Sequence, residues 1–196
     1  MILYIILISP IVAGIIFTII GFRIRQNALK IIGLLLLLAS AVVYFFFKSN
    51  QPSGESKICQ VSDAEGDTLL TEIVSNYSGR VVLVDFWDTW CSPCQIAMTR
   101  MDASGLKSGM MSDGVAFVYI ADESSPEDEW RERITEICGD HYRLSRSQIL
   151  SLYSIFEFEA IPSYVIIGAD GEVKQKCSGA KMDFIENALK TELDKK

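Results

Sequence analysis

The sequence of 196 residues leaves room for one domain of ordinary size and an additional segment. Residues 1–47 contain no acidic side chain and three cationic ones, so the remainder carries 15 Lys and Arg against 25 Asp and Glu, a formal net charge of −10. Because nucleic acids and anionic lipid surfaces are negatively charged, this balance argues against both as partners, and ordinary solubility is the simplest explanation of the acidity.

Two apolar stretches, residues 2–22 and 31–47, open the chain. At about 1.5 Å per residue, the first is long enough to cross the hydrocarbon core of a bilayer and the second is just long enough. A cleaved signal peptide is the alternative for the first stretch, but such peptides begin with basic residues and none precedes this one. We therefore predict a transmembrane helical hairpin with residues 23–30 as its turn.

The short turn of this hairpin holds three cations, Arg23, Arg25 and Lys30. Since positively charged loops stay in the cytoplasm, we expect both ends of the hairpin on the outer side of the membrane. Residues 48–57 are polar and contain Pro, Gly and three Ser, a composition typical of a flexible linker. The sequence thus predicts a multi-pass protein of the cell inner (cytoplasmic) membrane, with a domain of residues 58–196 facing the periplasm or extracytoplasmic side.

The first strand predicted in this domain covers residues 81–86, a nearly continuous apolar run. Apolar residues on both faces are typical of a central strand covered by helices on each side. Asp85 interrupts the run, and a carboxylate there is costly unless it has a partner or a task. Burial would raise its pKa and fit it to exchange a proton with a thiol. The alternative is a hydrated side chain at the edge of the sheet.

A Cys-x-x-Cys motif, Cys91 to Cys94, follows this strand and opens a predicted helix. Residues three apart are neighbours on a helix, so the two sulfurs can form a disulfide with little strain. Unpaired N–H groups and the helix dipole favour the thiolate form of Cys91, which would make it the nucleophile. Cys94 would then resolve the mixed disulfide. Pro93 suits the first turn because its missing N–H is not needed there.

Other uses of this cysteine pair fit the sequence less well. A zinc site needs four ligands, whereas the other cysteines stand alone and the chain has one histidine. Covalent haem attachment needs a histidine directly after the second cysteine, where Gln95 stands. A purely structural disulfide closing so short a loop would constrain the unfolded chain little. We therefore expect neither a metal nor another cofactor.

The rest of the domain alternates between strands and helices, which predicts an α/β fold with a mixed sheet. Ser124 or Ser125 could cap a helix whose first turn contains Pro126 and the acidic residues 127–129; these acids could instead form a docking surface for a basic partner. We predict helices from Cys91 and at residues 126–138, 148–156 and 183–193, and strands at residues 81–86, 115–120, 163–168 and 172–177.

Two motifs far apart in the chain resemble the thioredoxin superfamily. Residues 84–94 resemble its active-site strand and loop, and residues 159–164 resemble its cis-proline loop. The resemblance implies a thioredoxin-like fold over residues 58–196, in which helices flank a central mixed sheet. It also implies that the chain is a thiol–disulfide oxidoreductase with Cys91 and Cys94 as its redox-active disulfide.

The same resemblance implies where a substrate binds. The Ile161–Pro162 bond is expected to be cis, with the backbone of Ile161 beside Cys91, where it can pair with an incoming strand. A trans proline that opens an edge strand is the alternative. Trp90 and Pro93 are expected to belong to the docking surface beside the disulfide, with packing as the alternative for the tryptophan.

Within the superfamily, residues 66–70, 77–83 and 139–142 resemble the membrane-anchored TlpA/ResA-like group of extracytoplasmic reductants. This implies reduction of protein disulfides outside the cytoplasmic membrane, cytochrome c maturation as one such role, a membrane donor of electrons, and contact with the lipid bilayer through residues 1–47. Asp88 departs from the group, where a small residue is usual, and its charge should oppose thiolate formation. A disulfide oxidase or isomerase with the same motif, and a non-catalytic tethered adaptor, are the alternatives.

The remaining cysteines and rarer side chains have simpler expected roles. Cys138 and Cys177 could form a second disulfide in an oxidising compartment, or they could be two small core residues. No apolar run ends just before Cys59, which argues against a lipoprotein anchor and for a free or intermolecular thiol. His141 and Trp130 are expected to be structural.

Overall fold

The computed structural model describes Leu35, residues 38–42 and residues 55–195. Leu35 and residues 38–42 are helical and exposed. Within the described ranges, no helix is both long enough and apolar enough to cross a bilayer. The predicted spans, residues 2–22 and 31–47, otherwise lie outside the described residues, so the transmembrane hairpin stays a prediction.

The chain divides into two compact units, residues 1–50 and 51–196, and the second holds the sheet. The first strand begins at Ser56, inside the segment predicted to be a linker. Its first two residues pair with Gly139 and Asp140 of a strand far along the sequence. The folded domain therefore includes the last residues of that segment.

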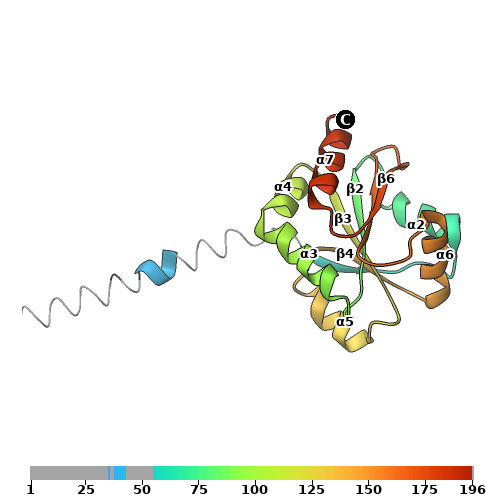
Figure 1. The fold of residues 1–196 in the computed structure, drawn as a ribbon, viewed down its shortest axis with the longest axis horizontal. Helices are drawn as coiled ribbons and strands as arrows, with labels where there is room; N and C mark the ends of the chain where they lie inside the picture. The colour runs from blue at the N-terminus through green and yellow to red at the C-terminus, as the bar shows by residue number, and fades with distance from the viewer. Residues whose placement is uncertain (1–34, 36–37, 43–54, 196) are drawn as a thin grey trace, which may run out of the picture. The chain divides into compact units, whose positions relative to one another are not determined.

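Across residues 55–195, six strands form one mixed sheet in the order β1-β4-β3-β2-β5-β6 (Figure 1). The first four strands in this order are parallel to one another, β5 is antiparallel to β2, and β6 is antiparallel to β5. The strands are β1 (Ser56–Cys59), β2 (Val82–Phe86), β3 (Ala116–Asp122), β4 (Gly139–Leu144), β5 (Ser163–Ile167) and β6 (Val173–Ser178).

The central strands are the ones with apolar residues on both faces. All five residues of β2 and all seven of β3 are buried, which confirms the prediction of central strands covered on each side. The last hairpin, β5 and β6, is also confirmed. By contrast, β4 has the polar sequence GDHYRL and was not predicted, although four of its six residues are buried.

Helices cover both faces of this sheet, so the domain has three layers (Figure 1). The core on one face takes buried side chains from α2 and α6, and the core on the other takes them from α3, α4, α5 and α7. The second core includes both cysteines of the motif. The helices are α2 (Gly66–Ser75), α3 (Ser92–Ala103), α4 (Leu106–Ser112), α5 (Glu127–Ile134), α6 (Arg146–Phe156) and α7 (Met182–Leu193).

The start and the end of α5 differ from the prediction. Pro126 is the N-cap residue and no side chain caps the helix, so the predicted serine cap is wrong. The acidic residues 127–129 do occupy the first turn, where their negative charges interact favourably with the positive end of the helix dipole. The helix ends at Ile134, and Cys138 lies beyond it. The Ser125 hydroxyl instead forms hydrogen bonds in the loop of the candidate active site.

Candidate active site

The two motif cysteines lie where β2 leads into α3. Cys91 is the N-cap residue of α3, and Pro93 is the second residue of the helix. The Sγ atom of Cys91 accepts a hydrogen bond from the backbone N–H of Cys94 at 3.2 Å. A sulfur at this position faces the unpaired N–H groups of the first turn, which stabilise negative charge on it.

Cys91 and Cys94 form a disulfide in this structure, with their Cα atoms 5.3 Å apart. Both cysteines are buried, at 3% and 0% exposure. The residues next to them are open to solvent, because Trp90 is 62% exposed and Pro93 is exposed. A partner would therefore reach the disulfide over this exposed rim.

The proline loop lies at the same end of the sheet as the disulfide. The Ile161–Pro162 bond is cis, as predicted. The next residue, Ser163, pairs with Phe86 at the end of β2, a few residues before Cys91. Ile161 is half-buried and packs against both cores, one of which contains the disulfide.

Asp85 lies on β2 and is 2% exposed. Its Oδ1 atom has no hydrogen-bond partner. Desolvation raises the pKa of the carboxyl from its ordinary 3.8 to about 8, although the positive charge of Lys107 acts in the opposite direction. The prediction of a buried carboxyl with a raised pKa is confirmed, and the hydrated edge alternative is wrong.

Asp88 connects the cysteine loop to the loop that follows β3. It is 4% exposed, and its Oδ1 atom accepts hydrogen bonds from the Ser125 hydroxyl at 2.7 Å and the Asp122 backbone N–H at 3.2 Å. The Ser125 hydroxyl also accepts from the backbone N–H of Thr89 at 3.0 Å. Burial raises the pKa of Asp88, and the hydrogen bonds from Ser125 and the Asp122 backbone act in the opposite direction.

We expect Ser125→Ala to lower the free energy of unfolding by about 1–3 kcal/mol, because it leaves buried polar groups on Asp88 and Thr89 without this partner. Urea unfolding measures the change. The matched control is Ser112→Ala, since Ser112 is exposed on α4 and its hydroxyl donates a hydrogen bond to the Ser108 carbonyl oxygen, away from this loop. That control should cost less than about 0.5 kcal/mol. Equal costs for the two variants would contradict the structural role of the Ser125 hydroxyl.

The single histidine is structural in this fold. His141 is fully buried, its Nε2 atom lies 2.8 Å from the carbonyl oxygen of Ile137, and its ring stacks on that of Tyr119. Burial lowers the pKa of the imidazole to about 4. Trp130, at 2% exposure, belongs to the core as predicted. Among the described side chains, no group of three or more His, Cys, Asp or Glu could hold a metal ion.

The other cysteines do not extend the site. Cys138 and Cys177 do not form a disulfide. Cys177 lies on β6 and Cys138 directly precedes β4, and three strands separate β4 from β6 in the sheet. Cys59 is a half-buried thiol on β1, and burial raises its pKa. A thiol that ionises poorly is a weak nucleophile, so the redox candidate remains the pair of Cys91 and Cys94.

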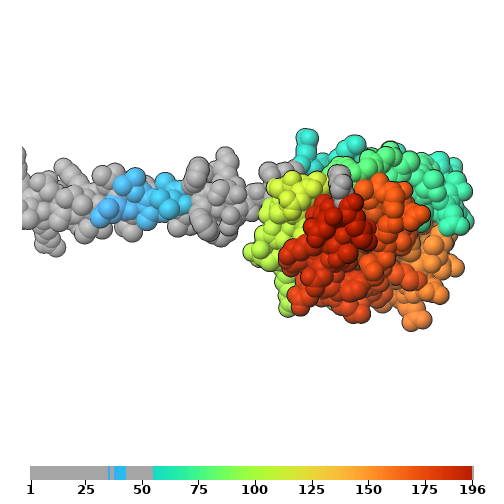
Figure 2. Space-filling view, turned by 90° about the horizontal axis from the view of Figure 1, so that it is seen from above, coloured from blue at the N-terminus to red at the C-terminus, as the bar shows by residue number. Residues whose placement is uncertain are grey.

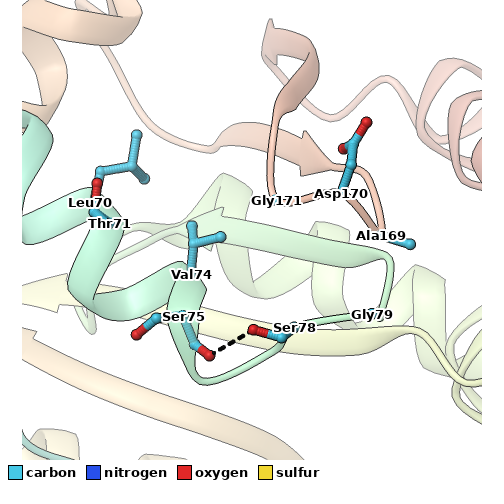
Figure 3. Close-up of a pocket in the computed structure, with 9 residues that line it drawn as sticks. All are labelled: Leu70, Thr71, Val74, Ser75, Ser78, Gly79, Ala169, Asp170 and Gly171. Carbon is cyan, nitrogen blue, oxygen red and sulfur yellow. Dashed lines mark hydrogen bonds between the residues drawn. The ribbon is translucent and has the colours of Figure 1, made fainter.

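A cavity of about 300 Å³ lies at the opposite end of the sheet (Figure 3). The lining of the cavity includes residues 169–171, which follow the C-terminal end of β5. Pro162 of the disulfide site directly precedes the N-terminal end of the same strand. The cavity therefore does not belong to the disulfide site. Its lining residues are Leu70, Thr71, Val74, Ser75, Ser78, Gly79, Ala169, Asp170 and Gly171.

Sequence similarity agrees with this geometry. Residues 79–173 match the thioredoxin-like family. The thiol-disulfide oxidoreductase ResA of Oceanobacillus iheyensis is 28% identical over 173 residues, covering 79% of this chain and 84% of ResA. ResA of Geobacillus kaustophilus is 25% identical over 134 residues, covering 64% of this chain and 73% of that protein.

Solved structures share the fold at lower identity. A thiol:disulfide interchange protein of the DsbE type from Chlorobium tepidum superposes with a TM-score of 0.51 at 18% identity, covering 72% of this chain and 98% of that one. A thioredoxin of Neisseria meningitidis gives a TM-score of 0.50 at 17% identity, covering 61% of this chain and 79% of that one. At these identities the comparison shows a common fold.

Proposed function

We propose that this chain, which carries a thioredoxin-like domain and is a thiol–disulfide oxidoreductase related to ResA, reduces disulfides of proteins outside the cytoplasmic membrane. The observation that carries the proposal is the disulfide between Cys91 and Cys94 at the N-terminus of α3, with an exposed rim beside it. A disulfide at a helix N-terminus that partners can reach is suited to exchange rather than to stability alone.

The reaction begins with the reduced pair. The Cys91 thiolate attacks one sulfur of a substrate disulfide, forms a mixed disulfide, and releases the other substrate sulfur as a thiolate. The Cys94 thiol loses its proton and attacks the Cys91 sulfur, which releases the second substrate sulfur. The substrate gains two electrons, and Cys91 and Cys94 are left as the disulfide seen in the structure.

Asp85 is the proposed acceptor of the Cys94 proton. Its carboxyl is buried on β2, the strand that leads to the motif, and a pKa raised to about 8 matches that of a thiol. Ile161 and Pro162 are proposed to pair with the backbone of the substrate, and Trp90 and Pro93 to contact its side chains. All four lie at the end of the sheet that holds the disulfide.

The setting of this reaction is also part of the proposal. The predicted hairpin of residues 1–47 would tether the domain to the lipid bilayer on the extracytoplasmic side, where disulfides of secreted proteins and apocytochromes c are found. A membrane donor would return electrons to the Cys91–Cys94 disulfide after each turnover.

The redox potential tests the direction of electron flow. We expect equilibration of the purified protein with reduced and oxidised glutathione or dithiothreitol to give a potential near that of thioredoxin, about −270 mV. The fraction of alkylated Cys91 and Cys94 reports the reduced state at each ratio. A potential near about −120 mV, that of a strong oxidase, would refute the reductant and support disulfide formation instead.

Cysteine labelling tests the orientation. Lys57→Cys, at an exposed position of β1, should react with a membrane-impermeant maleimide added to intact cells or spheroplasts in a Cys59→Ser background. Asn27→Cys, in the predicted turn, should react only after the membrane is opened. The reverse pattern would show the domain in the cytoplasm and overturn the extracytoplasmic assignment.

A further inference from the structure

A crevice of about 170 Å³ opens beside α5, at the ends of β1 and β4. Two arginines line it, Arg131 of α5 and Arg143 of β4, and so does Trp130. Sites for whole small molecules have volumes of about 300–1,000 Å³. This crevice is smaller, so it has room for a single functional group of a larger ligand.

The crevice lies at the end of the domain that holds the disulfide. Strands β1, β4, β3 and β2 are parallel, and the crevice takes Ile58 and Arg143 from the C-terminal ends of β1 and β4. Cys91 follows the C-terminal end of β2. Helix α5 and the start of α3 lie at the lower end of the domain in Figure 1, and Figure 2 views the domain from the opposite end, where α4 and α7 lie side by side. Ligands of open α/β sheets bind outside the C-terminal ends of parallel strands, where this crevice lies.

Hydrogen bonds connect the crevice to the loop before Cys91. The Arg143 Nη2 atom donates to the backbone carbonyl oxygen of Ser125 at 3.0 Å. The Ser125 hydroxyl donates to Asp88 and accepts from the backbone N–H of Thr89. A group bound at Arg143 would therefore lie close to the loop that carries the reacting sulfurs.

Two donors at the crevice lack a hydrogen-bond partner within the described part of the chain. They are the indole N–H of Trp130, a residue with 2% exposure, and the Nε–H of half-buried Arg143. No ion pair among residues 55–195 includes Arg143. A buried donor without an acceptor and a half-buried cation without a counter-charge both cost free energy, so this arrangement favours an anionic ligand that accepts hydrogen bonds.

Arg131 differs from Arg143 because it already has a carboxylate partner. Glu127, which also lines the crevice, accepts a hydrogen bond from Arg131 Nε at 2.8 Å, and its Oε1 atom lies 2.8 Å from Arg131 Nη2. Both side chains are more than half exposed, and an ion pair of this kind adds little stability. A carboxylate that enters the crevice would therefore compete with Glu127 for Arg131 and would meet Arg143 without a competitor.

Helix α5 separates the crevice from the cysteine loop. Glu127 and Arg131 line the crevice, whereas Glu129, halfway between them on the helix, has its Oε2 atom 3.5 Å from the Thr89 hydroxyl. Residues two apart do not share a face of a helix. An α-helix is about 10–12 Å across with its side chains, a width that an extended chain spans in about three to four residues. A substrate held at Cys91 could therefore reach the crevice with a residue a few positions along its chain.

We propose that the crevice binds one carboxylate of the substrate protein, an Asp or Glu side chain within about eight residues of the reacting cysteine, with Arg143 as its principal partner. This rests on the proposed function and adds a substrate class to it, namely disulfide proteins with an acidic side chain near the exchanging bond. A planar guanidinium group can form two parallel hydrogen bonds with a carboxylate, which favours it over a neutral side chain. Because the chain has a net negative charge, acidic substrates are selected at contact and not by long-range attraction.

Pairs of peptides that differ in one side chain test the proposal. Each peptide has one cysteine, in a disulfide with thionitrobenzoate, and either Glu or Gln at a position moved from about three to eight residues on either side of it. The reduced full chain attacks this disulfide through Cys91, and the absorbance of released thionitrobenzoate gives the second-order rate constant. After division by the rate constant with glutathione, the value for the Glu peptide should be about tenfold higher than that for the Gln peptide at the best position. A ratio near one at every position would overturn the proposal.

Variants of the crevice should move this ratio in opposite directions. Arg143→Gln should bring it close to one, since loss of the hydrogen bond to Ser125 affects both peptides alike, and Glu127→Gln should raise it by freeing Arg131. Arg133→Gln is the matched control, because Arg133 lies exposed on the same helix, pairs with Glu136 and does not line the crevice.

Each variant is made in the full chain and checked for a cooperative unfolding transition. Arg131→Gln should also lower the ratio, and it replaces Arg143→Gln if that variant does not fold. A wild-type ratio in the folded arginine variant, a lower ratio in Glu127→Gln, or a lost preference in Arg133→Gln would each contradict the assignment of the crevice.

A second measurement reports binding and not rate. In the full chain with Cys94→Ser, each peptide is held on Cys91 as a mixed disulfide, and the indole N–H signal of Trp130 is recorded by NMR. The signal should differ between the Glu and Gln complexes. If sodium sulfate shifts it while the two complexes give the same signal, the crevice binds free anions and the proposal is wrong. Failure of the proposed function is distinct, because neither peptide would then form a mixed disulfide through Cys91.

Discussion

Cys91→Ser should reduce the rate of insulin disulfide reduction to the uncatalysed background. The reason is that Cys91 is the sulfur at the N-cap of α3, where the Cys94 N–H already donates a hydrogen bond to it. A serine hydroxyl at that position ionises far less readily than a thiol and forms no disulfide. Turbidity of insulin with dithiothreitol as donor measures the rate, and far-UV circular dichroism confirms that the variant is folded.

Cys94→Ser should behave differently, although its steady-state activity is also lost. The intact Cys91 should still attack a substrate disulfide, and the mixed disulfide should then persist because Cys94 is absent to resolve it. Non-reducing electrophoresis and mass spectrometry should find substrate linked through Cys91. A tethered adaptor predicts the opposite, since its partners should be retained after both cysteines are replaced. Cys59→Ser, on the edge strand β1 and packed against the other core, is the control and should leave insulin reduction and resolution of the mixed disulfide unchanged.

The order of the central elements could be predicted because their signals are local. The apolar runs of β2 and β3, the turn between β5 and β6, and the cysteine motif at the start of α3 are each visible within a few residues. These fix the strand–helix order and hence an α/β fold. Their outlines agree with the structure to within one or two residues.

Four elements were not predicted, β1, α2, α4 and β4, and the last two depend on contacts far along the chain. β4 contains Asp140, His141 and Arg143, and a polar segment of this kind gives no strand pattern by itself. In the fold, Tyr77 donates a hydrogen bond to Asp140, and His141 is buried against Tyr119. Helix α4 has seven residues, two of which are serine and one glycine, so its sequence predicts no helix either.

In the candidate active site, too, local signals could be read from the sequence and contacts between distant residues could not. Asp85 could be identified because a carboxylate inside an apolar run is conspicuous, and the cysteine pair because of its spacing. The structural role of Asp88 could not, because it depends on Ser125, 37 residues away. The burial of Lys107 could not be foreseen for a similar reason, since α4 approaches the sheet only in the folded domain. Sequence spacing reveals the reacting sulfurs, whereas tertiary packing determines the charges around them.

Asp85→Asn should make the oxidised protein more stable near pH 8 and leave it nearly unchanged near pH 4. The carboxyl keeps its proton in the folded state up to about pH 8, whereas in the unfolded chain it loses it near its ordinary pKa of 3.8. Between these values the folded state binds one more proton, so rising pH favours unfolding. The contribution of this group is present below pH 4 and is lost at about 1.4 kcal/mol per pH unit as the pH rises towards 8.

The contribution of His141 to the pH dependence of stability must be distinguished from that of Asp85. Burial lowers the pKa of His141 from 6.5 to about 4, so its contribution has the opposite sign. Between pH 4 and 6.5 the unfolded chain binds the extra imidazole proton, so stability gained there with rising pH offsets the loss from Asp85. The most informative window is therefore pH 6.5 to 8, in which the unfolded imidazole loses its remaining half of a proton while the Asp85 carboxyl still lowers stability as the pH rises. Urea unfolding should show the wild type losing stability across this window, whereas Asp85→Asn should not.

The disulfide-exchange activity of Asp85→Asn should fall, although its stability near pH 8 rises. Without a carboxylate to accept the Cys94 proton, resolution of the mixed disulfide should slow on the order of 10²-fold, measured by single-turnover quench. Asp113→Asn, at the exposed C-cap of α4, is the matched control for both measurements and should follow the wild type. If the free energy of unfolding of Asp85→Asn changed with pH as steeply as that of the wild type, the Asp85 carboxyl would be ionised in the folded state. A variant that gains stability and loses exchange would show that one buried carboxyl lowers the stability of the fold and is required for its chemistry.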